Sequence, residues 1–96
     1  MKPSETLRMH RDEIRRTVLM HRARNARIFG SVLYGTDREG SDLDLLVDPL
    51  PETTLFDLGG LQDELQELLG VPVDVKTPGD LPASFRASVL AEARPV

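Results

Sequence analysis

The apolar residues along this chain alternate between helical and strand-like spacings, and this alternation predicts a series of helices and strands. Apolar residues recur at near-helical spacing among charged residues from about Glu5 to Arg24, which predicts a helix that Asn25 ends. The short apolar run 26–29, followed by glycine, is typical of a strand that enters a turn. After a polar, glycine-containing loop, residues 42–47 predict a second strand, which the prolines after it end.

The next segment predicts a leucine-rich helix. Thr53 or Thr54 can cap its N-terminus, and Gly70 stands where a C-terminal glycine cap belongs. Gly59 and Gly60 cost about 1 kcal/mol each relative to alanine, so either the helix is weak there or another group approaches its backbone closely. Leucines at spacings of three and four predict its buried face: Leu55, Leu58, Leu61, Leu65, Leu68 and Leu69.

The C-terminal part of the chain predicts a third strand and a last helix. Residues 71–76 show the valine alternation of a strand, and residues 77–79 form a predicted turn. Asp80 is the predicted N-cap of the last helix. The side chains predicted to face inward from that helix are Leu81, Phe85, Val89 and Leu90.

The composition is that of an ordinary globular protein, with 40% hydrophobic and 29% charged residues. A chain of 96 residues predicts one domain, residues 1–96, with little room for a second, substrate-binding lobe. No apolar run reaches transmembrane length and the N-terminal residues lack a secretory signal, so we expect a cytoplasmic protein. The absence of cysteine excludes disulfides, thiol catalysis and cysteine-ligated zinc.

Charge is distributed unevenly along the chain. Residues 1–29 contain eight Lys or Arg against three Asp or Glu, a net charge of +5, so residues 30–96 carry −9 of the total of −4. An acidic body repels phosphate and disfavours binding of the whole chain to nucleic acid. The basic segment is either a solvated helix face or a contact for an anionic partner.

Three aspartates are the candidate chemistry of the chain. Residues two apart in a strand point to the same face, so Asp42 and Asp44 would direct both carboxylates to one point. Asp74 lies between valines in the third predicted strand and would project to that same face. Carboxylates of this kind suit Mg²⁺, which takes few protein oxygens and completes its shell with water and phosphates. Taken singly, each aspartate could instead be a solvated or turn-capping residue.

Gly30 and Ser31 supply a complementary feature upstream of the acids. Glycine allows a backbone to approach a phosphate closely, and serine offers a backbone N–H and a hydroxyl to its oxygens. The chain therefore predicts a phosphate-handling site that combines this Gly-Ser pair with the three carboxylates.

This ordered set of features resembles the nucleotidyltransferases of the DNA polymerase beta superfamily. In the resemblance, Gly-Ser is followed eleven positions later by Asp-Leu-Asp, and a third aspartate stands on a later strand. The similarity extends to the Leu-Gly-Gly helix, the Val-Asp-Val strand and the Thr-Pro turn within residues 55–81. It covers nearly the whole chain and is greatest to the minimal nucleotidyltransferases of prokaryotes. It implies an α+β fold with a small mixed sheet and helices packed on one face.

The resemblance also implies roles for individual residues. Gly30 and Ser31 would hold the nucleoside triphosphate, and Asp42 and Asp44 would ligate two Mg²⁺ ions. Asp74 would be the third ligand and the candidate base for the acceptor hydroxyl. Family members are often antitoxins whose partner is a helical HEPN ribonuclease toxin, and some transfer AMP from ATP to a tyrosine of that toxin. Such a protein acceptor would fit the missing second lobe.

The chain departs from the family in the loop after Gly-Ser. Members commonly have arginine there, whereas residues 32–34 read Val-Leu-Tyr. Lys76 is expected to share a strand face with Asp74 and could supply the missing positive charge to the triphosphate, as could Arg38 on the loop. Tyr34 is either an aromatic packed on the sheet or a platform for the base.

Two functional hypotheses of different classes follow. The first is a Mg²⁺-dependent nucleotidyltransferase that modifies its partner toxin with AMP. The second is a catalytically weak or inactive antitoxin of the same fold that neutralises its partner by binding alone. Alanine at Asp42 or Asp44 would abolish the effect on the partner under the first hypothesis and leave it intact under the second. Transfer to a nucleic acid or a small molecule is disfavoured by the acidic body.

Overall fold

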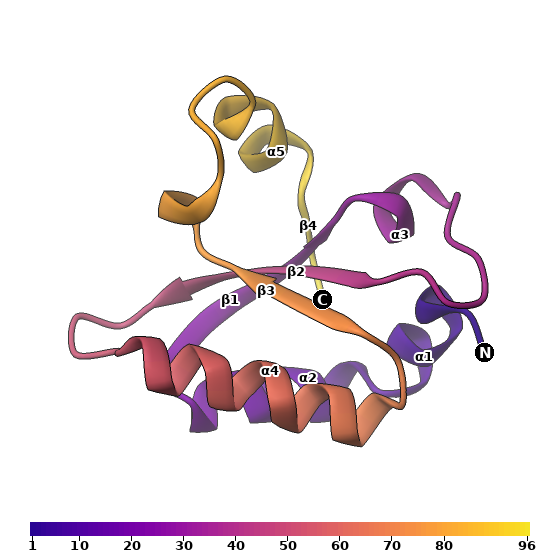
Figure 1. Ribbon diagram of the computed structural model, residues 1–96, viewed down its shortest axis with the longest axis horizontal. Helices are drawn as coiled ribbons and strands as arrows, with labels where there is room; N and C mark the ends of the chain where they lie inside the picture. Colours follow the sequence, from indigo (N-terminus) through magenta and orange to yellow (C-terminus); the bar gives the residue numbers. More distant parts are fainter.

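The computed structural model describes residues 1–96, and its helices and strands alternate along the chain (Figure 1). In chain order they are α1 (Pro3–Met9), α2 (Arg11–Met20), β1 (Ala23–Phe29), α3 (Ser31–Tyr34), β2 (Leu43–Pro49), α4 (Leu55–Leu69), β3 (Val73–Lys76), the 3₁₀ turn η1 (Pro78–Asp80), α5 (Arg86–Glu92) and β4 (Arg94–Pro95). None of these helices has both the length and the apolar character needed to span a bilayer.

The strands form one mixed sheet in the order β3-β2-β1-β4. β2 and β3 run parallel, whereas β1 is antiparallel to both β2 and β4. Helices α1, α2 and α4 cover one face of the sheet, and the short helices α3 and α5 lie on the other side (Figure 1). This arrangement confirms the predicted α+β class with a small mixed sheet and helices packed on one face.

The core lies between the sheet and the covering helices. Alternation along β2 buries Leu43, Leu45 and Val47 completely, as expected for a strand with one face on a core. Helix α4 contributes leucines at spacings of four. The core cluster comprises Leu7, Ile14, Val18, Ala23, Ala26, Ile28, Val32, Leu43, Leu45, Val47, Leu61, Leu65, Leu69, Val73 and Val96.

Helix α4 begins and ends where the sequence predicts. The Thr54 side chain accepts a hydrogen bond from the Asp57 backbone N–H, and Asp57 completes a capping box. Gly70, at φ 68°, ends the helix in the left-handed conformation. The prediction that Leu55 belongs to the buried stripe is wrong, because this first residue of α4 is 85% exposed.

The single helix predicted from Glu5 to Arg24 is wrong in its extent. His10, at φ −126° and ψ 22°, interrupts it and separates α1 from α2. Asn25 does not end a helix, since it lies inside β1 with φ 56°, where the pairing with β2 shifts register. Such a bulge favours asparagine, which tolerates positive φ. Residues 23 and 24, which the apolar spacing assigned to the helix, pair with β2 as the start of β1 instead.

The elements after β1 also differ from prediction at their ends. The short helix α3 and the strand β4 were not predicted. β2 continues through Pro49, which pairs with Ala23 at the end of the ladder. Asp80 closes the η1 turn by accepting the Thr77 N–H and is not the cap of the last helix. That helix, α5, starts only at Arg86 and buries none of its residues, because no element covers it.

Candidate active site

Asp44 and Asp74 are direct neighbours across the parallel pair β2 and β3. Leu43 pairs with Val73 and Leu45 with Val75 on either side of them, and these apolar residues face the core side of the sheet. Because side chains alternate along a strand, both aspartates project from the opposite face. The sheet therefore holds two carboxylates side by side on the face that α1, α2 and α4 leave open (Figure 1).

Asp42 lies one residue before β2 and is exposed. It therefore stands at the edge of the acidic pair. No group of three or more His, Asp or Glu side chains in the structure lies close enough to hold a metal ion. The predicted convergence is thus found for two of the three acids, Asp44 and Asp74, which pair across β2 and β3. Asp42 lies next to this pair but does not complete a cluster of three carboxylates.

Gly30 lies against Asp44. It follows β1 directly and has φ 72° and ψ −149°, a conformation that is essentially restricted to glycine. A Cβ added at this position would lie 2.3 Å from Oδ2 of Asp44. Gly30 and Asp44, which are fourteen positions apart in the sequence, therefore meet at one point. Ser31 then opens helix α3, with Gly30 as its N-cap residue.

The electrostatics of Asp44 reflect this crowding. Burial, together with the negative charges of Asp74 and Asp42, raises the pKa of Asp44 to about 6, and the Lys76 ammonium opposes the rise. A carboxylate whose ionisation is disfavoured by neighbouring acids gains from a bound cation. The raised pKa of Asp44 thus reflects first the burial of its carboxyl group and second the negative charges of Asp74 and Asp42 beside it.

Lys76 lies beside the acids, as predicted from its spacing. Its Nζ atom is 3.5 Å from Oδ1 of Asp74, and both side chains are about two-fifths exposed. An ion pair this exposed contributes little to stability. Its ammonium remains accessible from solvent and can contact an anionic ligand that approaches the open face.

Tyr34 lies at the surface and contacts α5. It is 62% exposed, and its hydroxyl donates a hydrogen bond to Glu92 of α5. This bond, together with the Glu92 charge, raises the pKa of Tyr34. Of the two alternatives for Tyr34, packing on the sheet does not fit this exposure. The contact with Glu92 joins α3 to α5.

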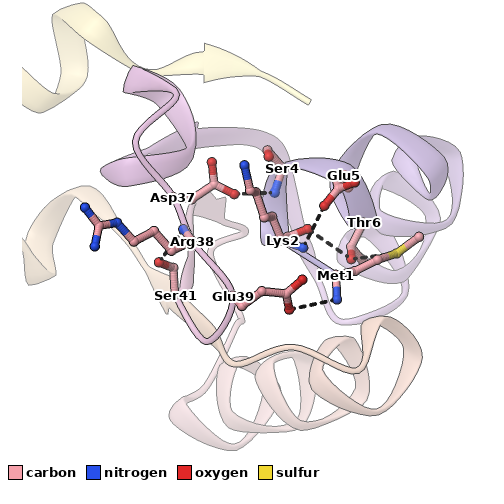
Figure 2. A network of polar contacts seen from close by, with 9 residues as sticks. All are labelled: Met1, Lys2, Ser4, Glu5, Thr6, Asp37, Arg38, Glu39 and Ser41. Carbon is pink, nitrogen blue, oxygen red and sulfur yellow. Dashed lines mark hydrogen bonds and ion pairs between the residues drawn. The ribbon is translucent and has the colours of Figure 1, made fainter.

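The loop between α3 and β2 is fixed at Asp37 (Figure 2). Asp37 is only 6% exposed, and its Oδ2 accepts the backbone N–H of Ser4 in the first turn of α1, at 2.8 Å. Burial raises the pKa of Asp37, but the hydrogen bonds from Ser4 and the Lys2 charge outweigh it, so the pKa lies below its ordinary value. Sequence reasoning missed this residue because no local pattern links positions 4 and 37.

Arg38 follows on the same loop and extends away from this network (Figure 2). Its backbone N–H donates to the Ser41 hydroxyl, which closes the turn before Asp42. The anchored loop thus carries one exposed arginine between the Gly-Ser turn and the acids of β2.

The donor set fits a hard divalent cation. It offers carboxylate oxygens only, and two neighbouring carboxylates suffice for Mg²⁺, which keeps several waters and takes its remaining ligands from substrate phosphates. None of the surface cavities is lined by any of the three acids. The acids therefore lie on an open surface.

Comparison with known protein families indicates the use of such a site. The family described as the nucleotidyltransferase domain matches residues 7–96 of this chain. The chain belongs to the nucleotidyltransferase family. A Methanocaldococcus jannaschii relative, MJ0435, named as a protein adenylyltransferase, is 37% identical over 89 residues, which span 88% of this chain and 96% of the relative. The protein adenylyltransferase MntA of Thermococcus cleftensis is 35% identical over 68% of this chain and 66% of its own length.

Solved structures agree with this assignment. A structure described as a minimal nucleotidyltransferase superposes with a TM-score of 0.86 and 43% identity, covering 97% of this nucleotidyltransferase and 95% of that chain. A toxin–antitoxin crystal structure with AMP-PNP has a TM-score of 0.66 over 97% of this chain and 71% of its own, and at 19% identity it shares the fold. The predicted membership of the minimal nucleotidyltransferases is confirmed, and with it the enzyme class.

Proposed function

We propose that this nucleotidyltransferase is an antitoxin that uses ATP and Mg²⁺ to transfer AMP to a tyrosine of a HEPN ribonuclease toxin in the cytoplasm. The observation that carries the proposal is the register of Asp44 and Asp74, with Gly30 against Asp44. The relatives named as protein adenylyltransferases support a protein acceptor. The toxin–antitoxin structure with AMP-PNP supports a toxin partner and an adenine nucleotide.

In this proposal the residues of the site divide into two sets. Gly30 and Ser31 bind the triphosphate through the backbone at the start of α3, and Lys76 adds its ammonium to the charge of the phosphates. Asp42, Asp44 and Asp74 are the carboxylates that would hold two Mg²⁺ ions. When bound, these ions neutralise phosphate charge and polarise the reacting oxygens.

The transfer requires an in-line displacement at the α-phosphorus. The tyrosine oxygen forms a bond to phosphorus, the bond from phosphorus to the oxygen bridging to the β-phosphate breaks, and pyrophosphate leaves. Asp74 accepts the hydroxyl proton, since its carboxylate stands on the accessible edge strand. Lys76, whose Nζ atom lies 3.5 Å from Oδ1 of Asp74, would supply positive charge to the leaving pyrophosphate. Catalysis then consists mainly of positioning and charge stabilisation.

An open acidic surface favours a macromolecular acceptor. The three aspartates line none of the cavities, so no enclosed pocket selects a small acceptor. A folded partner that presents a tyrosine on its own surface can reach the acids and exclude water from them. This geometry accounts for transfer to an acceptor that residues 1–96 do not enclose.

A second candidate is neutralisation of the toxin by binding alone. It is favoured by two observations: no three acids come close enough to hold a metal, and the turn after Gly30 contains Val32, Leu33 and Tyr34, where the resemblance leads us to expect arginine. Under this alternative the fold and the acids persist, and the surface of the protein blocks the toxin without chemistry.

The intact mass of a co-expressed HEPN partner separates the two candidates. The partner is incubated with ATP and Mg²⁺ and either the native chain or a variant with Asp42→Ala and Asp44→Ala. Adenylyl increments that appear only with the native chain support transfer. A complex of equal stability with both proteins, and no increment with any nucleoside triphosphate, supports binding alone.

A further inference from the structure

Asp74 stands on the edge strand of the sheet. β3 is only four residues long, and β2 is its sole neighbour. In a strand, successive N–H groups point to opposite sides, so the Asp74 N–H faces β2 while those of Val73 and Val75 face outward. Short edge strands with free outward N–H groups fray or pair with other chains. A proposed catalytic acid on such a strand needs an additional restraint.

Two glutamines of α4 supply that restraint. The Gln66 side-chain oxygen accepts the Val73 N–H at 3.1 Å, and the Gln62 side-chain oxygen accepts the Val75 N–H at 3.0 Å. The match is geometric: four residues of helix rise about 6 Å, and two residues of strand span about 6.6 Å. Helix α4 runs along β3 (Figure 1). The two amides therefore substitute for a neighbouring strand on both sides of Asp74.

We propose that Gln62 and Gln66 are positioning residues that hold Asp74 in register with Asp44 and thereby set the affinity of the site for divalent metal. The inference rests on the proposed function. The glutamines act through the backbone on either side of Asp74 and touch no reacting atom. Supporting residues of this kind determine how precisely a ligand oxygen is placed, and their loss typically lowers metal affinity 10- to 100-fold.

The test uses substitutions that separate the hydrogen bond from the shape of the side chain. Gln62→Met and Gln66→Met keep the length and remove the acceptor oxygen, whereas Gln62→Glu keeps an oxygen that can accept the Val75 N–H. Val18→Ala, a core substitution in α2, serves as a control for loss of stability alone. All proteins are full-length.

Three quantities are measured on each protein: hydrogen exchange of the Val73 and Val75 amides, binding of Mn²⁺ without nucleotide by electron paramagnetic resonance, and the Mg²⁺ concentration that gives half-maximal AMP transfer. We expect both methionine variants to speed exchange of the contacted amide about tenfold. We expect their Mn²⁺ dissociation constants and half-maximal Mg²⁺ concentrations to rise about tenfold, with little change in kcat at saturating metal. Gln62→Glu stays near the native values in all three quantities, and Val18→Ala stays near them in Mn²⁺ affinity and in the half-maximal Mg²⁺ concentration.

Two results would overturn the proposal: amide exchange that is unchanged in the methionine variants, or faster exchange with a Mn²⁺ affinity no weaker than that of Val18→Ala. Failure of the proposed function is distinguishable. A native protein that binds Mn²⁺ but transfers no AMP contradicts the transfer reaction, and the Mn²⁺ affinities still decide the role of the glutamines. A native protein that binds no Mn²⁺ contradicts both.

Discussion

A Cβ atom at residue 30 would lie 2.3 Å from Oδ2 and 3.1 Å from Cγ of Asp44. The contact joins the end of β1 to β2, and it leaves no space for any side chain beside the carboxylate. Because Gly30 also has φ 72° and ψ −149°, glycine is required there by both space and backbone conformation. The Gly-Ser pair is therefore part of the acidic site and not only a turn.

Gly30→Ala is expected to abolish AMP transfer and to lower the free energy of unfolding by about 1–3 kcal/mol, the cost of a strained backbone conformation. The Cβ must displace the Asp44 carboxylate. Gly35→Ala is the matched control, since Gly35 has φ 70° and nothing within 4 Å of its added Cβ. It should lose stability but keep its transfer rate per folded molecule. Equal losses of activity in both variants would contradict a specific role for Gly30.

The raised pKa of Asp44 predicts a pH dependence in protein freed of metal with EDTA. The pKa is about 6 in the folded state against 3.8 ordinarily, so between these values the folded state keeps a proton that the unfolded state has released. Stability therefore falls as pH rises from about 4 to about 6 and stays reduced above. Asp44→Asn removes this contribution and should raise the urea midpoint at pH 8. Because Asp44 is partly solvated, screening by water and salt reduces its effect on the free energy of unfolding.

The difference between the native and Asp44→Asn midpoints, followed from pH 4 to pH 8, isolates Asp44 from the other titrating groups. Added Mg²⁺ should then stabilise the native chain at pH 8 more than the variant, because a bound cation favours the ionised carboxylate. A midpoint difference that does not change with pH would contradict the raised pKa.

Asp37→Ala is expected to destabilise the protein by about 1 kcal/mol, the usual contribution of a helix-capping side chain. It removes the acceptor of the Ser4 N–H that joins the loop to α1 (Figure 2). Since the pKa of Asp37 is lowered on folding, its contribution is present above about pH 4 and is lost as pH falls further. Chemical denaturation at pH 7 and pH 3 measures this.

Glu39→Gln provides the comparison for Asp37. Glu39 lies on the same loop, but it is exposed and its ion pair with the Met1 ammonium is accessible to solvent. We expect a change in the free energy of unfolding of less than about 0.5 kcal/mol. If Glu39→Gln destabilises as much as Asp37→Ala, burial of Asp37 is not the reason for its contribution.

Gly59→Ala is expected to stabilise α4 by about 1 kcal/mol, because nothing lies within 4 Å of the added Cβ. At Gly60 the Cβ would meet the His21 ring at 3.4 Å, so the gain there should be smaller. The structure thus favours a weak helix over a close approach as the meaning of the glycine pair. Thermal unfolding of both variants checks this, and destabilisation by Gly59→Ala would contradict it.

The acidic face was predictable because it depends on alternation along two strands. Asp44 and Asp74 each stand between apolar residues, and this pattern places both carboxylates on the face opposite the core. The order of the strands is not encoded in that pattern. The direct pairing of Asp44 with Asp74 depends on the parallel crossover through α4, which was not predicted.

Contacts between distant residues were not predictable from local patterns. The Asp37–Ser4 bond and the glutamine bonds to β3 join residues with no shared periodicity. The spacing of Phe85 and Leu90 indicated a buried face on the last helix, yet both are substantially exposed. Periodicity shows that a face is apolar, but not whether another element covers it.

The rate at which the native chain transfers labelled AMP from ATP to a HEPN partner, compared with Asp44→Asn, Asp74→Asn and Asp63→Asn, tests the central claim most directly. Asp63 is an exposed acid on α4 and serves as the control. We predict a loss of at least about 100-fold for both site variants and none for Asp63→Asn. Transfer by Asp74→Asn at the native rate would contradict the assignment of the paired aspartates as the catalytic site.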